Sequence, residues 1–566
     1  MVDVVVVGLG PTGLTLAHLL GRRGLEVVVL EREPQFYGMA RAVYTDDECL
    51  RVLQAAGVAE DVAKDMLIDT PVQWVRRDGS VIGQFIQTSR PQGWPVLNFL
   101  YQPWFENTLE DLLSRYPNVT ARRGRQVVSV AQDGDDVRVV HAACSGTNFG
   151  QCEPVLGEQE EIATRYVVAC DGGRSTVRGL LGIDLTGERY PDRWLVVDIR
   201  AAEIEGQRDP QTFRHLPYFN FVCDPDLPTV SCPQPGGYHR FEFLLKDTQT
   251  TGQMEDPATI REHLARFVDP DQVEVVRALV YQFNALVADR WRDRRVLLAG
   301  DAAHMTPQFM GQGMSSGIRD AHNLAWKLDA VLTRGASEAI LDRYGAERSP
   351  HAKAMIDISV RMRDFVSLEH PVKAGLRDAL VIGGLKVPRV REYFHEAKFK
   401  PGPVFEPGAF LGQPRQGGSG AQGCLFPQPL VRTFDGRHER FDDVAGDGFC
   451  LLGIECDPTA YLPPADRAAW ERVDLTTLTL YGLGRRPQGL RTAGARVGAG
   501  VVELEDLHGT ALPWTQRHGI RPGDVVVLRP DHVVFAVVPA SRIAAATAWL
   551  SSELGLPPLR TLQPQT

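Results

Sequence analysis

The chain has 566 residues, of which 43% are hydrophobic and 23% charged, and its formal net charge is −10 at pH 7. This composition predicts a globular protein of two or three domains, and the acidic balance argues against nucleic acid or a membrane as partner. Nine cysteines without C-x-x-C spacing, and no signal peptide or bilayer-spanning stretch, predict a cytoplasmic protein with neither a disulfide framework nor a metal site.

A dinucleotide-binding pattern opens the chain. Residues 2–7 form an apolar, β-branched run that predicts a buried strand, and Gly8-x-Gly10-x-x-Gly13 follows at once. These glycines allow a tight turn, close approach of the backbone to a pyrophosphate, and close helix–strand packing. Glu31 ends the next predicted strand, where a carboxylate can accept a hydrogen bond from a ribose hydroxyl. The motif therefore predicts a dinucleotide site but leaves open which dinucleotide binds.

The segment that follows predicts an excursion into a second domain. Arg41 fits a place over a cofactor and a place in solvent equally well, so its role stays open on the residues alone. From about residue 72 to 94 the pattern alternates, and Asp78-Gly79 predicts a hairpin. Gln102 stands at the start of a helix that returns the chain to the first domain.

A second acidic turn comes after the strand predicted over residues 165–170. Asp171 ends that strand, and Ser175 is placed to cap the next helix. The stretch 124–161 before it predicts antiparallel strands. Residues 185–283 are rich in strands and aromatic side chains, which is typical of the wall of an aromatic-binding pocket. For any single ring, however, a sheet that packs its own core is the commoner explanation.

A third acidic turn lies past the middle of the chain. Residues 295–300 predict a buried strand, Asp301 follows it, and a loop rich in glycine over 307–313 precedes a long amphipathic helix. Glycines at the positive end of a helix favour a phosphate-bearing ligand, and the carboxylate can accept from hydroxyls. Three such turns, far apart in sequence, predict one extended ligand gripped along its length. A simple NAD dehydrogenase would instead use one contiguous Rossmann unit.

The rest of the chain predicts a separate small α/β domain. Residues 400–430 are rich in glycine, proline and glutamine, which is typical of a linker or a draped loop. Strands are predicted near 448–454, 474–480, 523–530 and 532–538, and a final helix near 541–554.

Together, the three turns resemble the fingerprints of class A FAD-dependent aromatic hydroxylases, in the order and spacing of the para-hydroxybenzoate hydroxylase fold. The loop after Asp301 and the tail after residue 400 are more similar to the 3-(3-hydroxyphenyl)propionate hydroxylase branch and its polyketide hydroxylase relatives. Members of that branch end in a thioredoxin-like domain. Cys450 and Cys456 lack C-x-x-C spacing, so we expect no redox exchange there.

The resemblance implies an α/β fold: a Rossmann-like FAD-binding domain, an inserted antiparallel-sheet substrate domain and a C-terminal thioredoxin-like domain. It places the FAD-binding domain with its connecting helices at 1–72, 97–185 and 285–395, and the substrate-binding sheet at 73–96 and 186–284. A linker at 396–430 and the thioredoxin-like domain at 431–566 complete the expected organisation.

The resemblance also implies a reaction. FAD is the expected cofactor and NAD(P)H the co-substrate, and a phenolic or polycyclic aromatic is hydroxylated with O2 through a flavin C4a-hydroperoxide. The expected partners are thus a small aromatic substrate, O2 and NAD(P)H, with a homodimer as a candidate assembly. The residues expected to bind the cofactor are Gly8, Gly10, Gly13, Glu31, Arg41, Gln102, Asp171, Asp301, Pro307, Gly311, Gln312 and Gly313.

The group that favours the phenolate is left open. Surface or structural roles fit each candidate as well, and His304 is expected to be structural. Two alternatives to a hydroxylase also remain: an FAD-dependent dehydrogenase or oxidase of the same superfamily, and a flavoprotein scaffold that acts through its C-terminal domain. The candidates for the catalytic role are His215, Tyr218, Tyr238, His239 and Arg240.

Overall fold

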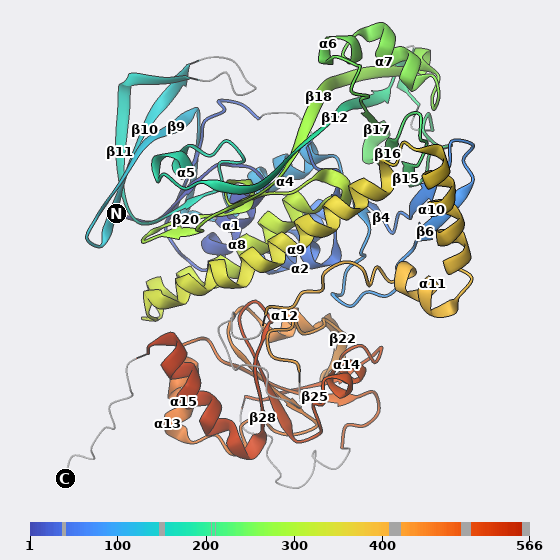
Figure 1. Ribbon diagram of the computed structural model, residues 1–566. Helices are drawn as coiled ribbons and strands as arrows, with labels where there is room; N and C mark the ends of the chain where they lie inside the picture. The colour runs from blue at the N-terminus through green and yellow to red at the C-terminus, as the bar shows by residue number, and fades with distance from the viewer. Residues whose placement is uncertain are drawn as a thin grey trace, which may run out of the picture.

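The computed structural model describes residues 1–36, 41–145, 153–204, 207–209, 211–406, 420–487 and 500–556. Three large sheets, with helices packed on them, give a mixed α/β fold. The helices α8 (Gln312–Thr333) and α9 (Asp342–Val366) lie between the first part of the chain and the C-terminal part (Figure 1). Among the described helices, none is long and apolar enough to cross a membrane.

The first sheet is mainly parallel and carries the acidic turns. Its strand order is β19-β20-β11-β1-β2-β8, with β10 and β9 added antiparallel at β11. Parallel pairing brings the carboxyl ends of β1, β2, β11 and β20 to one edge, where ligands of α/β folds bind. The strands are β1 (Val2–Val7), β2 (Val27–Glu31), β8 (Val119–Arg123), β9 (Arg125–Asp133), β10 (Asp136–Ser145), β11 (Glu153–Ala169), β19 (Arg292–Asp293) and β20 (Val296–Leu298).

Helix α1 (Pro11–Arg22) packs against α8, and the approach of the two is very close. A Cβ added at Gly317 would lie 2.1 Å from the Thr12 hydroxyl, so only glycine fits there. The other helices of this part are α2 (Asp47–Ala55), α3 (Ala59–Ala63), α4 (Gln102–Leu112) and α5 (Thr176–Leu180). A small sheet joins β3 (Tyr44–Thr45), β7 (Asn98–Phe99) and β4 (Leu67–Ile68).

The second sheet is mainly antiparallel and has the order β21-β18-β12-β17-β16-β15-β5-β6. The hairpin predicted around Asp78-Gly79 is confirmed: β5 and β6 pair antiparallel and join this sheet through β15. One face packs on α6 (Thr251–Met254) and α7 (Pro257–Leu264). The strands are β5 (Val72–Val75), β6 (Val81–Phe85), β12 (Leu185–Ala201), β15 (Phe219–Val222), β16 (Thr229–Gln234), β17 (Tyr238–Leu244), β18 (Val273–Ala288) and β21 (His304–Met305). A separate two-stranded pair is β13 (Glu203–Ile204) with β14 (Gln207–Arg208).

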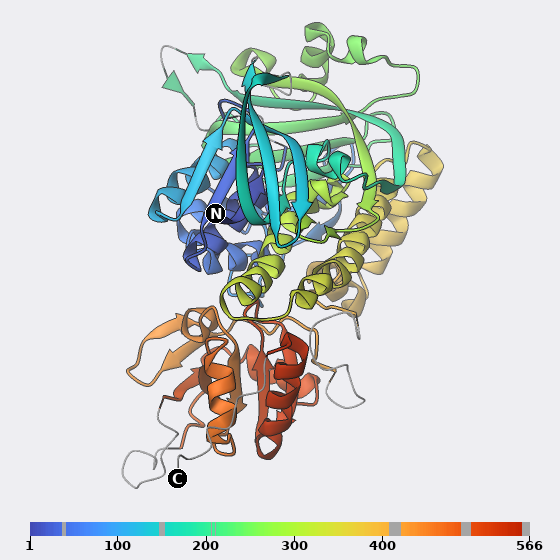
Figure 2. The same ribbon diagram turned by 90° about the vertical axis from the view of Figure 1, so that its left-hand side faces the viewer.

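The third sheet forms the C-terminal part, which Figure 2 shows below the rest of the molecule. Its strand order is β23-β22-β26-β25-β24-β27-β28. The strands are β22 (Leu430–Thr433), β23 (His438–Arg440), β24 (Cys450–Ile454), β25 (Thr476–Gly482), β26 (Val502–Asp506), β27 (Asp524–Leu528) and β28 (Val534–Pro539). Its helices are α12 (Phe441–Ala445), α13 (Pro464–Glu471), α14 (Ala511–Arg517) and α15 (Ile543–Leu554).

The segment expected to be a linker contacts the rest of the protein at both of its described ends. Helices α10 (Pro371–Gly384) and α11 (Pro388–His395) precede it, and the Lys400 ammonium lies 2.8 Å from the Asp46 carboxylate. On the far side, Phe426 is fully buried in the core of the third sheet. Residues 407–419 of the expected linker lie outside the described residues. The later flank therefore packs into the C-terminal part, whereas residues 396–406 are mostly partly exposed and are held by contacts such as that of Lys400.

A buried charge cluster joins α8 and α9 to the third sheet. Arg529, just after β27, donates to both carboxylate oxygens of Glu347 (2.7 and 3.1 Å) and to Asp531 (2.9 Å). Lys327 donates to Glu347 (2.8 Å), and the Trp326 indole to Asp531 (3.1 Å). Burial alone raises the pKa of Glu347, but Arg529 and Lys327 outweigh it and lower that pKa to about 2.

Candidate functional site

Each glycine in the turn after β1 is needed there for a separate physical reason. A Cβ on Gly8 would lie 2.4 Å from the Cys170 carbonyl oxygen, and one on Gly13 only 2.0 Å from the Gly8 carbonyl oxygen. A Cβ on Gly10 would instead meet no atom within 4 Å, because that residue faces a cavity. Two glycines thus close the turn, and the third leaves room for a ligand beside the backbone.

Glu31 lies at the end of β2 and holds the same turn. One carboxylate oxygen accepts from the Leu9 N–H (2.8 Å) and the other from the Glu33 N–H (2.9 Å). These bonds fix the carboxylate beside the glycine turn, although Glu31 does not line the cavity itself. Its contact with a ribose stays a prediction.

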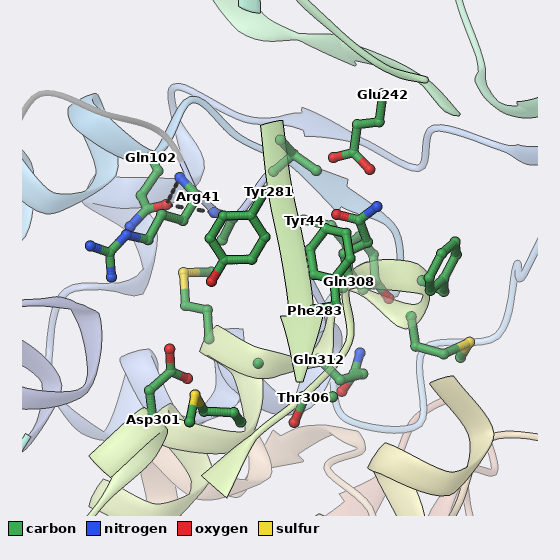
Figure 3. A pocket seen from close by; sticks show the side chains of 18 of the residues that line it. Arg41, Tyr44, Gln102, Glu242, Tyr281, Phe283, Asp301, Thr306, Gln308 and Gln312 are labelled. Atoms are coloured by element: carbon green, nitrogen blue, oxygen red, sulfur yellow. Dashed lines mark hydrogen bonds between the residues drawn. The ribbon is translucent and has the colours of Figure 1, made fainter. Parts of the chain in front are cut away.

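Gln102 fixes the segment that begins at Arg41. Its Oε1 accepts from the backbone N–H groups of Arg41 and Ala42, both at 2.6 Å (dashed lines in Figure 3). From the other side, the Arg240 guanidinium donates to the Arg41 carbonyl (2.7 Å). Both Arg41 and Gln102 line the cavity. This segment is thereby held between helix α4 and strand β17.

We expect Gln102→Leu to weaken cofactor binding. The change leaves two backbone N–H groups without their acceptor, which costs about 1–3 kcal/mol for a buried group. The FAD retained per chain after gel filtration should fall, together with the thermal midpoint of unfolding. Gln516→Leu, at an exposed position on α14, should change neither; equal FAD retention in the two variants would contradict the prediction.

The turn after β11 presents a carboxylate to the cavity. Asp171 Oδ2 accepts from the Val177 N–H (3.2 Å), whereas Oδ1 is buried and has no hydrogen-bond partner among the described residues. Burial raises the pKa of Asp171. Gly172 beside it is open to the cavity. As predicted, Ser175 caps α5 by accepting from the Arg178 N–H (3.0 Å).

The third turn is anchored from helix α8. Asp320 accepts from the Gly300 N–H (3.0 Å) and from His304 Nε2 (2.7 Å), and Arg348 of α9 donates to its other oxygen (2.8 Å). His304 therefore has the structural place expected for it. Asp301 itself lines the cavity, and burial raises its pKa. A carboxylate in this setting is satisfied by hydroxyl donors of a ligand.

The loop after Asp301 brings the start of α8 to the cavity. Gly311 has φ +60°, and a Cβ there would lie 2.8 Å from the Tyr44 ring. Gln312 and Gly313 open helix α8 and line the cavity, whereas Pro307 does not line it. The free N–H groups of a helix start are suited to a ligand with partial negative charge.

All three turns face one cavity of about 1090 Å³, which continues to the inner face of the second sheet (Figure 3). The turn end offers open backbone at Gly10, Gly172 and Gly313, and the buried oxygen of Asp171 that lacks a partner among the described residues. These features fit an elongated ligand with pyrophosphate and hydroxyl groups, as FAD is. The sheet end is lined by aromatic rings, among them Trp74, Phe85, Phe219, Phe221, Tyr281, Phe283 and Phe309.

Of the five candidates for the catalytic role, only Arg240 lines this cavity. The His215 ring bonds the Phe267 carbonyl (2.8 Å) at the surface, and Tyr218 is 38% exposed. Tyr238 stacks on Tyr101, with ring centroids 4.0 Å apart. His239 points to the other face of the sheet, where it bonds the Ser231 hydroxyl (2.9 Å) and burial lowers its pKa to about 3.

One lining residue that the sequence did not single out is Glu242. It lies two positions beyond Arg240 on β17, so both side chains share the cavity face. The two-residue spacing of Arg240 and Glu242 can be read from the sequence. The sequence does not tell which face of the strand lines a cavity.

The chain is similar to known proteins along almost its whole length. The FAD binding domain family matches residues 1–359, and the HcaD C-terminal domain family matches residues 423–553. A 3-(3-hydroxy-phenyl)propionate/3-hydroxycinnamic acid hydroxylase of Burkholderia cenocepacia (strain HI2424) is 35% identical over 96% of this chain and 95% of its own. The hydroxylase of that name from Mycobacterium avium (strain 104) is 36% identical, over 98% and 93%.

Solved structures share the fold. The OxyS anhydrotetracycline hydroxylase from Streptomyces rimosus has a TM-score of 0.70 at 26% identity, over 98% of this chain and 99% of that one. Aklavinone-11 hydroxylase, solved with FAD and aklavinone, has a TM-score of 0.73 at 23% identity with the same coverage.

Proposed function

Because this chain belongs to the class A FAD-dependent aromatic hydroxylases, we propose that it hydroxylates a phenolic ring with NAD(P)H and O2. FAD is its cofactor, and the enzyme is a monooxygenase. The observation that carries the proposal is the continuous cavity. Its turn end suits a dinucleotide, and its sheet end suits an aromatic ring.

The residues around the turn end are proposed to hold FAD. Gly10 and the start of α1 would take the pyrophosphate, in the turn that Gly8 and Gly13 close, and Glu31 would take the adenosine ribose. Asp301 would bind in the ribityl or pyrophosphate region, where its carboxylate can accept from ribityl hydroxyls. The loop from Pro307 to Gly313 would face the isoalloxazine through Gly311, Gln312 and Gly313, which line the cavity. The remaining proposed cofactor residues are Gly8, Arg41, Gln102 and Asp171.

When bound, FAD supplies the redox chemistry, passing electrons from NAD(P)H to O2 and an oxygen atom to the ring. The chain's own task is to orient the substrate and keep water away. The apolar walls are suited to this: Phe309 packs edge-on against Trp194, with centroids 5.3 Å apart, and Phe283 lies beside it. Such rings offer contact area but no proton that could leak into the reaction.

Three finer points complete the proposal. The C-terminal part would be thioredoxin-like, which is supported by its βαβ unit (β24, α13, β25) and its β27–β28 hairpin followed by α15. Burial raises the pKa of the Cys456 thiol to about 11, which argues against redox exchange there. We also propose a cytoplasmic location and a homodimer. Light scattering would test the homodimer.

A turnover experiment tests the function. Purified protein should show a flavin absorbance spectrum, and 3-(3-hydroxyphenyl)propionate, the compound in the relatives' names, should stimulate NAD(P)H oxidation. The product should gain one oxygen atom, carried over from labelled O2. Polycyclic phenols form the second set of substrates. Substrate oxidation without incorporation of label would point to a dehydrogenase or oxidase, and a protein that binds no flavin would exclude the proposal.

A further inference from the structure

Glu242 places a carboxyl group on the cavity face of the second sheet. The side chain is 6% exposed, lines the cavity and points into it in Figure 3, opposite Asp301. Its strand neighbours on β12 and β16 are Val196 and Val230, which also line the cavity. An acidic group therefore stands between two apolar neighbours on this wall, at the end where the aromatic ring would lie.

The cations nearest to Glu242 are bonded elsewhere. Arg240 donates to both oxygens of Asp198 (2.6 and 3.1 Å), and the Arg277 guanidinium lies 3.0 Å from the same carboxylate. Within the described part of the chain, the Glu242 carboxyl takes part in no hydrogen bond or ion pair. The Glu242 oxygens are open to the cavity, and a ligand that covered them without bonding to them would incur a cost of about 1–3 kcal/mol. The carboxyl group thus has its bonding capacity left for a ligand.

The surroundings also set the charge of this group. Burial raises the pKa of Glu242 to about 7, Arg240 and Arg277 oppose the rise, and Asp198 adds to it. On β16 the Cys232 thiol is neutral, since burial raises its pKa well above the usual value. Near neutral pH, Glu242 therefore exists in both forms and can accept a proton.

We propose that Glu242 accepts the hydrogen bond of the substrate's phenolic hydroxyl and takes its proton as the ring is hydroxylated. The phenolic O–H bond breaks, an O–H bond forms on the carboxylate, and the electron pair stays on the phenolic oxygen, which enriches the ring. The same charge disfavours a substrate carboxylate at this end of the cavity. The inference rests on the proposed function and specifies where the phenol lies.

Binding can be measured without turnover. In the oxidised holoenzyme without NAD(P)H, the flavin absorbance change would report titration with 3-(3-hydroxyphenyl)propionate and with 3-phenylpropionate, which lacks the hydroxyl. We expect the unmodified enzyme to bind the phenol about 10- to 150-fold more tightly, as a hydrogen bond to a charged acceptor gives. Glu242→Leu should bring the ratio of the two affinities close to one.

Turnover separates proton transfer from binding. An amide oxygen still accepts a hydrogen bond but takes no proton, so Glu242→Gln should keep most of the affinity while kcat falls about 10²- to 10⁴-fold. Since the ionised carboxylate is the active form, kcat/KM of the unmodified enzyme should rise as pH increases through about 7. Glu242→Gln should lack this rise. In this variant kcat should fall least for acidic phenols, because they ionise without the help of a base. Glu262→Gln on α7, at an exposed position, should behave like the unmodified enzyme.

FAD content and thermal unfolding establish whether each variant is folded. If Glu242→Leu does not fold, the pH profile of the isosteric Glu242→Gln tests the proposal instead. If kcat with the phenol and the pH profile of kcat/KM are the same in Glu242→Gln as in an active unmodified enzyme, the role of Glu242 alone is overturned. If the unmodified flavoprotein itself responds to no phenol, the proposed function fails, and this inference fails with it.

Discussion

Replacing Arg529 by methionine is expected to lower the free energy of unfolding by about 3–5 kcal/mol, because it leaves buried carboxylates short of a cation. Arg529 is fully buried and donates to both Glu347 and Asp531. Lys327 alone then has to balance both acids. Methionine fills a similar volume, so the loss would come from charge and hydrogen bonding, with little contribution from an empty space.

The same variant should unfold at a higher pH when acidified. Glu347 has a folded-state pKa of about 2, below its usual 4.5, so its carboxylate contributes stability fully above pH 4.5. That contribution is lost as the pH falls from about 4.5 towards 2. Without Arg529 the pKa of Glu347 rises, and the acid unfolding transition therefore moves to a higher pH.

Urea unfolding and an acid titration, both followed by circular dichroism, measure these effects. Arg22→Met is the matched control, because Arg22 also pairs across to the C-terminal part, with Asp447 at 2.9 Å. That pair is exposed, and we expect its loss to cost no more than about 1 kcal/mol. Equal losses in the two variants would contradict the importance given to the buried cluster.

Asp320→Ala is expected to release FAD as well as to destabilise the chain by about 3–5 kcal/mol. Asp320 is fully buried, and its side chain holds the Gly300 N–H, His304 and Arg348 at once. Burial raises the pKa of Asp320, but His304 and Arg348 outweigh it and lower the pKa, so the group is ionised. Its removal leaves the Arg348 cation buried and frees the turn that carries Asp301.

The FAD-to-protein ratio after dialysis, together with thermal unfolding with and without added FAD, tests this. Asp357→Ala on α9 removes an exposed carboxylate that pairs with Lys353 and should cost at most about 0.5 kcal/mol. Full FAD occupancy in Asp320→Ala would show that the turn keeps its form without this anchor.

The parts of the fold with strong local signals could be predicted. The run after Val2, the glycine turn and the carboxylates that follow strands have distinctive patterns, because a buried parallel strand is apolar throughout. The same holds for Asp78-Gly79, since the turn between β5 and β6 needs a residue that accepts a positive φ, and Gly79 has φ +80°. In each case the pattern itself lies within a short stretch of the chain.

The substrate end could not be predicted in the same way. Alternation on β17 separates His239 from Arg240 and Glu242. The face that lines the cavity, however, depends on how the whole sheet packs, including β12, whose paired residues lie over forty positions earlier in the chain. The bonds of Gln102 to the segment at Arg41 likewise join residues about sixty positions apart. Such contacts arise from tertiary packing and leave no periodic trace in the sequence.

Two neighbouring residues of α9 serve opposite ends of the molecule. Glu347 binds Arg529 of the C-terminal part, while Arg348 binds Asp320, which anchors the turn of Asp301. Binding events that favour the same ordered helix are thermodynamically linked, and the linkage is reciprocal. We therefore expect FAD to protect the C-terminal part from proteolysis. Weakening the attachment of that part, as in Arg529→Met, should in turn lower the affinity for FAD.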